Sequence, residues 1–433
     1  MGLFQSLCRF TQAYHPDPLI DPSQAYLILS MPKLTLRDLS LDNQRVLMRV
    51  DYNVPLDDKA EGMVITDDTR IKETLPTLKY LQEKGAKIIL MSHLGRPKGQ
   101  RDPKQSLAPV AKRLSELLDR PVAFAHDCIG SETESMTRSL KKGEILLLEN
   151  LRYHNEEEQN DKTFAESLSK LADIYVNDAF GAAHRAHAST EGITHFVTKK
   201  AIGFLMEKEL QFLGEELNKA QKPFVVIIGG AKVSDKIKVI DKMIDKATTI
   251  IIGGGMAYTF GLALGRKIGN SLCEPDKVDT AKAALEKAKA RGVKLLLPID
   301  NFIVEILDFK AKTVSPGKYV GADLIPEGWQ GVDIGPETIR LYSEEIASAK
   351  TVLWNGPMGV FEIKECSKGT YAIAEVIAKN KACLSIIGGG DSVKAIKKSG
   401  FSDEVSFIST GGGASLEFLE NGTLPGVECL PNL

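Results

Sequence analysis

The chain has 433 residues, enough for two or three domains, because single hydrophobic cores stop growing near roughly 250–300 residues. Hydrophobic residues make up 43% and charged residues 26%, which is ordinary for a globular protein. The 55 basic and 57 acidic side chains leave a net charge of −2, so no overall field attracts nucleic acid or an anionic membrane. Any phosphate group must therefore be bound by a local cluster.

The six cysteines are scattered and form no C-x-x-C pair, which argues against a zinc site or a disulfide framework and for reduced thiols in a cytosol. No apolar run reaches the roughly 18 residues of a membrane-spanning helix. Residues 1–31 lack a convincing basic region, apolar core and cleavage site, so we interpret them as a loose leader or a mistaken start rather than a targeting signal.

From about residue 44 the chain repeats a short apolar run, a polar or glycine-rich turn and a helical period. The runs predict strands at Val46–Val50, Ile88–Ser92, Ile145–Leu148, Ile174–Val176, Phe224–Ile228, Thr249–Ile252, Lys294–Leu297, Thr351–Trp354, Leu384–Ile387 and Val405–Ile408. Continuous Val/Ile/Leu runs separated by helices are typical of parallel strands that are buried on both faces. The sequence therefore predicts an α/β fold in two halves, with the charged amphipathic helix Glu207–Leu217 as the connector.

The residues that follow these strands differ between the halves. Open parallel sheets bind ligands beyond the carboxyl ends of their strands, so these residues are the candidates for function. Arg, His and Asn follow the first-half strands, whereas glycines follow the second-half strands. The first half is suited to a small anion held by side chains, and the second to a larger ligand that approaches the backbone.

The first half carries a basic cluster: Arg49, Arg96, Arg152 and Arg185 lie at or near strand ends, and Arg70 opens the next helix. The guanidinium fork matches pairs of carboxylate or phosphate oxygens and stays charged. Asp51 and Asn53 add acceptors for a ligand hydroxyl. A single arginine is more often a surface charge, but the recurrence at strand ends favours an anion site.

Histidines of the first half allow two interpretations each. His93 is either a general base or a hydrogen-bond donor to the bound anion. We favour binding, because a histidine in this setting more often donates to an anion, and a carboxylate that attacks a phosphate is already ionised near pH 7 and needs no base. His184 and His187 have helical spacing, but without a third ligand they are a weak metal signal.

In the second half, the segment from Gly229 to Lys236 follows a strand and opens a helix. Glycines let backbone amides approach phosphate oxygens, and a helix N-terminus adds a favourable partial charge. Lys232 and Lys236 are four residues apart, so we expect both on one helical face. The chain contains no Walker A loop and no G-x-G-x-x-G after a first strand, which disfavours a dinucleotide oxidoreductase.

Two acidic residues stand among these glycine turns. Asp391 follows Gly388-Gly389-Gly390, where it either holds Mg²⁺ against phosphates or caps the next helix. We favour the metal, because capping does not need the glycines. Glu362, at the end of the loop from Trp354, is a candidate for ribose hydroxyls, with a solvated surface acid as the alternative.

Together these motifs resemble the phosphoglycerate kinase family. They occur in family order and cover residues 33–433: Arg49 to Pro55, Ser92-His93-Leu94-Gly95-Arg96-Pro97, Glu149 to Tyr153, Ala183 to His187, Gly229 to Lys236, Trp354 to Glu362, Gly388 to Ser392 and Thr410 to Ser415. Tyr52 and Tyr153 stand where the family usually has Phe, which removes no ligand atom.

The resemblance implies a kinase that transfers a phosphoryl group, reversibly and with Mg²⁺, between ATP and the carboxylate of 3-phosphoglycerate, giving ADP and 1,3-bisphosphoglycerate, in glycolysis and gluconeogenesis. It implies Arg70 and Lys236 as catalytic residues. The implied phosphoglycerate site comprises Asp51, Tyr52, Asn53, Arg70, His93, Leu94, Gly95, Arg96, Arg152 and Arg185. The implied nucleotide site comprises Gly230, Lys232, Lys236, Asn355, Glu362, Gly389, Gly390, Asp391 and Ser392, with Asp391 as the metal ligand.

The resemblance also implies two doubly wound parallel-sheet domains that are joined by a hinge. We expect a substrate domain over residues 32–205, a nucleotide-binding domain over 206–416 and a tail, 417–433, that packs back on the first domain. The hinge is expected around Gly203–Leu217, with a second point near Thr410–Ser415. We expect a cytoplasmic monomer that binds neither nucleic acid nor membrane.

Two other functions stay open at this level. A different acyl-phosphate or sugar kinase would need another substrate cluster, which the chain does not offer. A non-catalytic nucleotide-binding protein would have lost a transfer residue, yet Arg70, Lys232, Lys236 and Asp391 are present. Consumption of Mg-ATP with and without 3-phosphoglycerate separates the three.

Overall fold

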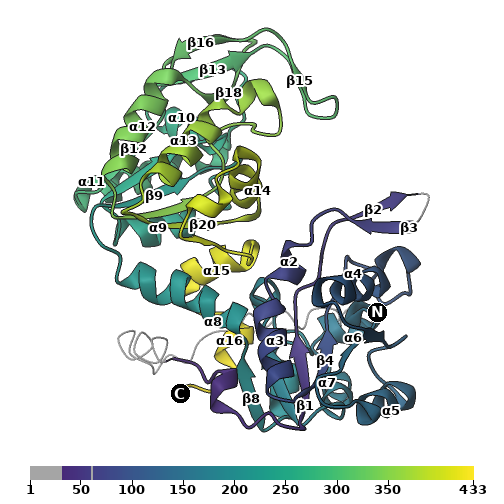
Figure 1. Ribbon diagram of the computed structural model, residues 1–433. Coiled ribbons are helices and arrows are strands. Elements are labelled where there is room, and N and C mark those ends of the chain that lie inside the picture. The colour runs from purple at the N-terminus through teal and green to yellow at the C-terminus, as the bar shows by residue number, and fades with distance from the viewer. Residues whose placement is uncertain (1–31, 60–61) are drawn as a thin grey trace, which may run out of the picture.

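The computed structural model describes residues 32–59 and 62–433, and these form two α/β domains, each built on a six-stranded parallel sheet (Figure 1). Helices cover both faces of each sheet. The predicted fold class of two doubly wound parallel-sheet domains is therefore confirmed. The leader, residues 1–31, lies outside the described residues. Within the described part, every helix is too short or too polar to cross a lipid bilayer.

The first sheet has the strand order β5-β6-β4-β1-β7-β8. Its strands are β1 (Arg45–Arg49), β4 (Lys87–Met91), β5 (Val122–Phe124), β6 (Ile145–Leu147), β7 (Ile174–Asn177) and β8 (Lys199–Ile202). The four predicted strands are present, but the edge strands β5 and β8 were not predicted. An edge strand is buried less, so β8 begins with two lysines and lacks the continuous apolar run of a central strand.

Side chains of each central strand alternate between two hydrophobic clusters, one on each face of the sheet. In β1, Val46 and Met48 pack with α3 and α4, whereas Leu47 packs with α7. The helices of this domain are α2 (Thr69–Lys72), α3 (Leu75–Glu83), α4 (Ala108–Leu118), α5 (Ser131–Ser139), α6 (Asn155–Glu158) and α7 (Lys162–Ser169).

The second sheet has the strand order β12-β10-β9-β19-β20-β21. Its strands are β9 (Phe224–Ile228), β10 (Thr249–Ile252), β12 (Lys294–Leu296), β19 (Thr351–Asn355), β20 (Leu384–Gly388) and β21 (Phe407–Ile408), all of which were predicted. The chain winds outward from β9 to β12 and then returns to the other side of β9. The neighbours β9 and β19 therefore form the topological switch point, where open sheets bind ligands.

Helices cover this sheet on both faces. They are α9 (Ile237–Ile244), α10 (Met256–Ala263) and α11 (Val278–Ala290) on one face, and α12 (Pro336–Ser348), α13 (Lys368–Lys379) and α14 (Gly390–Ser399) on the other.

Smaller elements decorate both domains, and none of them was predicted. The additional strands are β2 (Leu56–Lys59), β3 (Gly62–Ile65), β11 (Lys267–Ile268), β13 (Asp300–Val304), β14 (Leu307–Asp308), β15 (Thr313–Val314), β16 (Lys318–Gly321), β17 (Leu324–Ile325) and β18 (Gln330–Ile334). Short 3-10 helices occur at Leu36–Asp38, Pro103–Gln105, Leu151–Tyr153, Phe180–Ala182, Gly192–His195, Pro275–Lys277, Lys364–Cys366 and Ser402–Glu404.

The connector between the domains is α8 (Phe204–Leu210) followed by the π-helix η6 (Gln211–Glu216). It begins earlier than the predicted start at Glu207. The reason is Asp178 at the end of β7, whose buried carboxylate accepts hydrogen bonds from the Met206 amide at 2.9 Å and from Thr77 at 2.7 Å. Burial raises the pKa of Asp178 to about 6.

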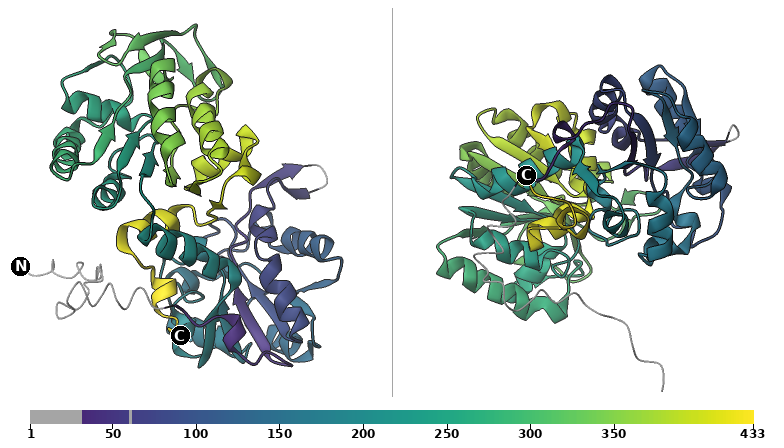
Figure 2. Two further views of the ribbon diagram at one scale, coloured as in Figure 1. Left: turned by 60° about the vertical axis from the view of Figure 1, so that its left-hand side comes forward. Right: turned by 90° about the horizontal axis from the view of Figure 1, so that it is seen from below.

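The C-terminal segment leaves the second sheet through α15 (Gly413–Asn421) and α16 (Pro425–Glu428) and ends against the first domain (Figure 2). Leu34 donates its amide to Pro431 at 3.0 Å, and Asn177 donates its side-chain amide to Gly426 at 2.9 Å. The Phe418 ring packs edge-on against Phe180 with centroids 5.8 Å apart. The last residues are thus hydrogen-bonded to the first residues that the structure describes.

Two segments of the chain pass from one domain to the other: α8, and the segment that follows β21. Glu209 of α8 joins them. Its fully buried carboxylate accepts hydrogen bonds from Ser409 Oγ at 2.7 Å and from the Thr410 amide at 2.6 Å. Burial raises the pKa of Glu209 to about 7, although these hydrogen bonds favour the ionised form.

Because the folded-state pKa of Glu209 lies above the unfolded one, the folded protein keeps a proton that the unfolded chain releases first. Its contribution to stability is therefore fully present below about pH 4.5 and is lost as the pH rises towards about 7. We expect the melting temperature of wild type to fall relative to that of Glu209→Gln across this range and the difference to be constant above it. A difference that does not vary with pH would contradict the prediction.

Candidate functional site

The first group of candidate residues gathers at the carboxyl ends of β1, β4 and β7. The Arg70 guanidinium from α2 forms an ion pair of 2.6 Å with Asp51, which follows β1. Asn53 accepts a hydrogen bond from the Gly95 amide at 2.9 Å, which joins the loops after β1 and β4. These side chains therefore lie at one edge of the sheet, as predicted from parallel strands.

Arg49 belongs to the basic cluster by sequence, but it is fully buried beneath the others. It donates to Ser189 at 2.8 Å and to the Val50 carbonyl, and it lies 4.0 Å from the buried Glu157 carboxylate. A charge that is buried away from solvent needs a partner of opposite charge. Arg49 and Glu157 therefore form a buried pair that supports the cluster from beneath and is not part of its binding surface. The interpretation of Arg49 as an anion-binding side chain is corrected accordingly.

His93 is held by Arg49, whose terminal nitrogen lies 3.1 Å from its Nδ1. Burial, followed by the charges of Arg49 and Arg152, lowers the pKa of His93 well below its usual value. The imidazole is therefore neutral. Because arginine can only donate, Nδ1 accepts and Nε2 carries the proton, so Nε2 can donate a hydrogen bond.

Arg152 is nearly buried and only partly satisfied. It donates to the Gly95 carbonyl at 2.8 Å and pairs with Glu158 at 3.1 Å, but its buried Nε has no hydrogen-bond partner among the described residues. Burial lowers the pKa of Arg152, against the attraction of Glu158. A buried donor without a partner costs free energy, which an anion's oxygen would relieve.

The remaining candidates of the first domain differ in exposure. Arg96 and Arg185 are exposed, and neither forms an ion pair within residues 32–59 and 62–433. Tyr52 and Leu94 point the other way: their side chains lie in the hydrophobic core, with the Tyr52 hydroxyl 2.7 Å from Thr74. Their backbone, rather than their side chains, is therefore what these two residues can offer to a ligand.

The histidine pair was a weak metal signal, and within residues 32–59 and 62–433 no metal-compatible group includes it. His187 lies 3.8 Å from Glu157, and burial lowers its pKa to about 3. Among the described residues, the only trio with metal-compatible spacing is Asp127, Cys128 and His154. Its carboxylate already pairs with Arg101 at 2.7 Å and with His154 at 2.7 Å, which makes it a satisfied ion pair network.

The glycine turns of the second domain meet at the switch point between β9 and β19. A Cβ atom on Gly229 would overlap the Pro357 carbonyl oxygen, and one on Gly356 would overlap the Gly229 carbonyl. Gly230 and Gly356 also have φ angles of 120° and 106°, which other residues rarely adopt. Glycine is therefore required for these two loops to approach each other.

Lys236 lies across this switch point and donates to the Asn355 side-chain oxygen at 2.5 Å. Burial lowers the pKa of Lys236, and the buried Asn355 Nδ2 has no hydrogen-bond partner in the described part of the chain. Lys232 is exposed. Because α9 begins only at Ile237, the segment from Lys232 to Lys236 is not helical, and the predicted common helical face is wrong.

The N-terminus of α14 carries the next candidates. Gly389 is the N-cap residue, so Asp391 lies in the first turn and makes no capping hydrogen bond. The capping interpretation is therefore wrong. The carboxylate is exposed and lies 3.2 Å from Lys394, and oxygen donors of this kind suit Mg²⁺. Ser392 is fully buried and accepts a hydrogen bond from the Gly356 amide.

Glu362 is exposed at the end of the loop after β19. The loop is held by Asp333, which sequence analysis missed: this buried carboxylate accepts from the Gly369 amide at 2.7 Å and packs against Gly359. Burial raises the pKa of Asp333 to about 7. Its only sequence signal is an acid at the end of a strand, which is common at helix starts.

Comparisons with known proteins agree with this arrangement. The phosphoglycerate kinase family model matches residues 36–422. The chain is 56% identical over 406 residues to a phosphoglycerate kinase of Acidobacterium capsulatum, covering 92% of this chain and 99% of that one. It is 55% identical to that of Koribacter versatilis, over 93% of this chain and 100% of that one.

Solved structures are similar as well. The phosphoglycerate kinase of Coxiella burnetii matches with a TM-score of 0.80 and 39% identity, over 91% of this chain and 97% of that one. The enzyme of Pyrococcus horikoshii matches with a TM-score of 0.76 and 34% identity, again over 91% and 97%. With a family model over most of its length and relatives above half identity, the chain belongs to the phosphoglycerate kinase family.

Proposed function

We propose that this chain catalyses reversible, Mg²⁺-dependent phosphoryl transfer between ATP and the carboxylate of 3-phosphoglycerate, giving ADP and 1,3-bisphosphoglycerate, in glycolysis and gluconeogenesis. The observation that carries the proposal is the buried, unpartnered donor on each side: Arg152 Nε in the first domain and Asn355 Nδ2 in the second. Each lies among side chains or turns suited to phosphate and carboxylate oxygens. Family membership supports the same reaction.

On the first domain, 3-phosphoglycerate is bound by charged and polar side chains. Arg152, Arg96 and Arg185 offer donors that no carboxylate among the described residues fully occupies. Neutral His93 donates from Nε2. The proposed site comprises Asp51, Asn53, Arg70, His93, Arg96, Arg152 and Arg185, with the backbone of Tyr52, Leu94 and Gly95.

On the second domain, the nucleotide is bound largely by backbone. The proposed site comprises Gly230, Lys232, Lys236, Asn355, Glu362, Gly389, Gly390, Asp391 and Ser392, and Glu362 is assigned to the ribose hydroxyls. Asp391 would hold Mg²⁺, which would supply positive charge to neutralise the phosphates. The exposed carboxylate beside two glycines leaves room for hydrated metal and phosphate together.

Catalysis requires positioned cations rather than a base, because the acceptor carboxylate is already ionised. Arg70 and Lys236 would stabilise the charge on the transferring group from opposite sides. In the structure Arg70 pairs with Asp51 and Lys236 donates to Asn355, and the phosphoryl group would take the place of these partners. We further propose a cytoplasmic monomer, in keeping with the free thiols of the described cysteines.

The ligands would lie on different domains, 32–205 and 206–416, with the tail 417–433 on the first. In-line transfer needs reacting atoms within about 3–3.5 Å, so we propose closure about Gly203–Leu217 and Thr410–Ser415. Closure also excludes water, which would otherwise accept the phosphoryl group.

The reaction is tested by Mg-ATP consumption with and without 3-phosphoglycerate, in wild type and Lys236→Ala. We expect consumption that requires 3-phosphoglycerate, and a loss of about 10²–10³ in kcat for the variant, because a cation at the transferring group is removed. Turnover on another acceptor would indicate a different kinase, and no turnover a binding protein. A near-normal kcat with a raised KM for ATP would refute the role of Lys236.

Arg152→Lys tests whether the guanidinium fork matters beyond its charge. Lysine cannot make paired hydrogen bonds, so we expect the KM for 3-phosphoglycerate to rise by about tenfold while the KM for ATP stays unchanged. Steady-state kinetics with each substrate varied measures both. An unchanged KM for 3-phosphoglycerate would leave Arg152 with a structural role only.

Closure is tested by small-angle X-ray scattering. We expect the radius of gyration to fall when both ligands are present and to change partly or not at all with either alone, because only both together complete the reacting geometry. If the doubly liganded protein scatters like the free protein while turnover is normal, the hinge proposal is wrong.

A further inference from the structure

The short helix α2 carries Arg70, and its start is fixed by the two acidic residues before it. Asp67 Oδ1 accepts a hydrogen bond from the Thr69 amide at 2.8 Å, which orients the first turn. Four residues are too few to hold a helix by themselves. The position of Arg70 therefore depends on what holds Asp67, Asp68 and Thr69.

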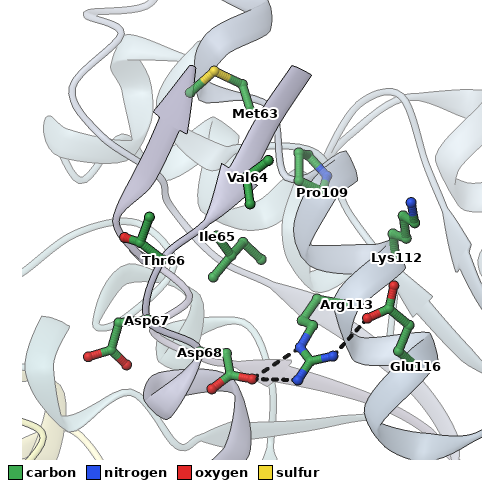
Figure 3. Close-up of a pocket in the computed structure, with 10 residues that line it drawn as sticks. All are labelled: Met63, Val64, Ile65, Thr66, Asp67, Asp68, Pro109, Lys112, Arg113 and Glu116. Atoms are coloured by element: carbon green, nitrogen blue, oxygen red, sulfur yellow. Dashed lines mark hydrogen bonds and ion pairs between the residues drawn. The ribbon is translucent and has the colours of Figure 1, made fainter. Parts of the chain in front are cut away.

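One clamp comes from the helix's own domain. Asp68 accepts two hydrogen bonds from Arg113 of α4, at 3.0 and 2.8 Å, and Arg113 also pairs with Glu116 at 2.7 Å (Figure 3). These residues line a pocket of about 560 Å³ between the β2–β3 hairpin and α4. Asp67 lies apart from the Arg113 group, so it is available to another element.

The second clamp comes from the other domain. Lys397, in the last turn of α14, donates to Asp67 Oδ2 at 3.0 Å and to Thr69 Oγ1 at 2.6 Å. Burial raises the pKa of Asp67, but hydrogen bonds from Thr69 and Lys397 outweigh it and bring the pKa to about 2. The carboxylate is thus ionised throughout the neutral range, and the contact persists there.

This contact links two parts of the proposed site. Lys397 lies on the helix whose first turn contains Asp391, and Asp67 and Thr69 directly precede Arg70. An exposed ion pair adds little to the stability of a folded protein. Its position matters more, because misplacing a reacting group by about 1 Å can cost about 10²-fold in rate.

We propose that Lys397 is a positioning residue: by holding Asp67 and Thr69, it fixes α2, and with it the Arg70 guanidinium, relative to the nucleotide end of α14. This inference rests on the proposed function. Lys397 contacts Asp67 and Thr69, which belong to neither proposed binding site, and it acts through the backbone of α2.

The kinetic test compares Lys397→Met, Lys397→Arg and the matched control Lys381→Met, whose lysine pairs with Glu404 on the same domain. We expect Lys397→Met to lower kcat by about three- to tenfold, with both KM values changed by less than about twofold, because binding groups remain in place. Lys397→Arg should restore most of kcat. Lys381→Met should behave as wild type.

A second measurement does not depend on the reaction. Hydrogen exchange of the amides of residues 69–73, measured by mass spectrometry on the unliganded protein, should be faster in Lys397→Met and unchanged in Lys381→Met. Asp67→Asn should lower kcat like Lys397→Met, and the double variant should be no slower than the slower single one.

The outcomes separate the two proposals. Wild type without 3-phosphoglycerate-dependent turnover would refute the proposed function. Unchanged exchange or unchanged kcat in Lys397→Met, or additive losses in the double variant, would refute the positioning role and leave the proposed function standing.

Discussion

Two buried carboxylates, one at each end of α8, determine how the two domains of this molecule are joined. Asp178 binds the start of the helix to the end of β7, and Glu209 binds its last turn to the segment after β21. Among the described residues neither carboxylate has a cation as a hydrogen-bond partner, and the donors to each are backbone amides and hydroxyl groups. Such a joint is strongly directional, because a carboxylate that leaves its donors would be buried without compensation.

The two sheets solve the problem of binding anions in different ways. In the first domain, the positive charge comes from arginine side chains that lie above the buried pair of Arg49 and Glu157. In the second, glycines bring backbone amides close together at the switch point, and Lys236 is held among them. Side chains suit a small ligand that must be recognised on several sides, whereas backbone suits a chain of phosphates.

Buried polar groups with hydrogen-bond partners and those without them are distributed unevenly in the two domains. Arg49 and Glu157 beneath the basic cluster, and Asp333 in the second domain, have hydrogen-bond partners. Arg152 Nε and Asn355 Nδ2 have none within residues 32–59 and 62–433. Buried donors are rarely left unpaired in a folded protein. An unpaired buried donor destabilises the free protein, and a ligand that supplies an acceptor removes this cost. The same groups therefore affect both the stability of the free protein and its affinity for the ligand.

The sequence by itself determined the central strands, the parallel sheets and which residues follow the strands at the edge of each sheet. It could do so because strands buried on both faces need unbroken apolar runs, and because parallel strands bring their carboxyl ends to one edge. It failed at the edge strand β8, where lysines are tolerated, and at Lys232 and Lys236, where spacing alone suggested a helix that begins later.

Only the tertiary structure decided which way each side chain faces and which distant partners it meets. Tyr52 and Leu94 lie beside Asp51 and His93 in the sequence, yet they turn into the core, on the same side as Val46, Met48 and Val50, because the alternation of the strand continues past its end. Since both faces of a doubly wound sheet are buried, the alternation by itself does not tell which set of side chains faces the site. The contact of Lys397 with Asp67 joins residues 330 positions apart. No local pattern encodes such a pair, since its distance is set by how two separately folded sheets are held together.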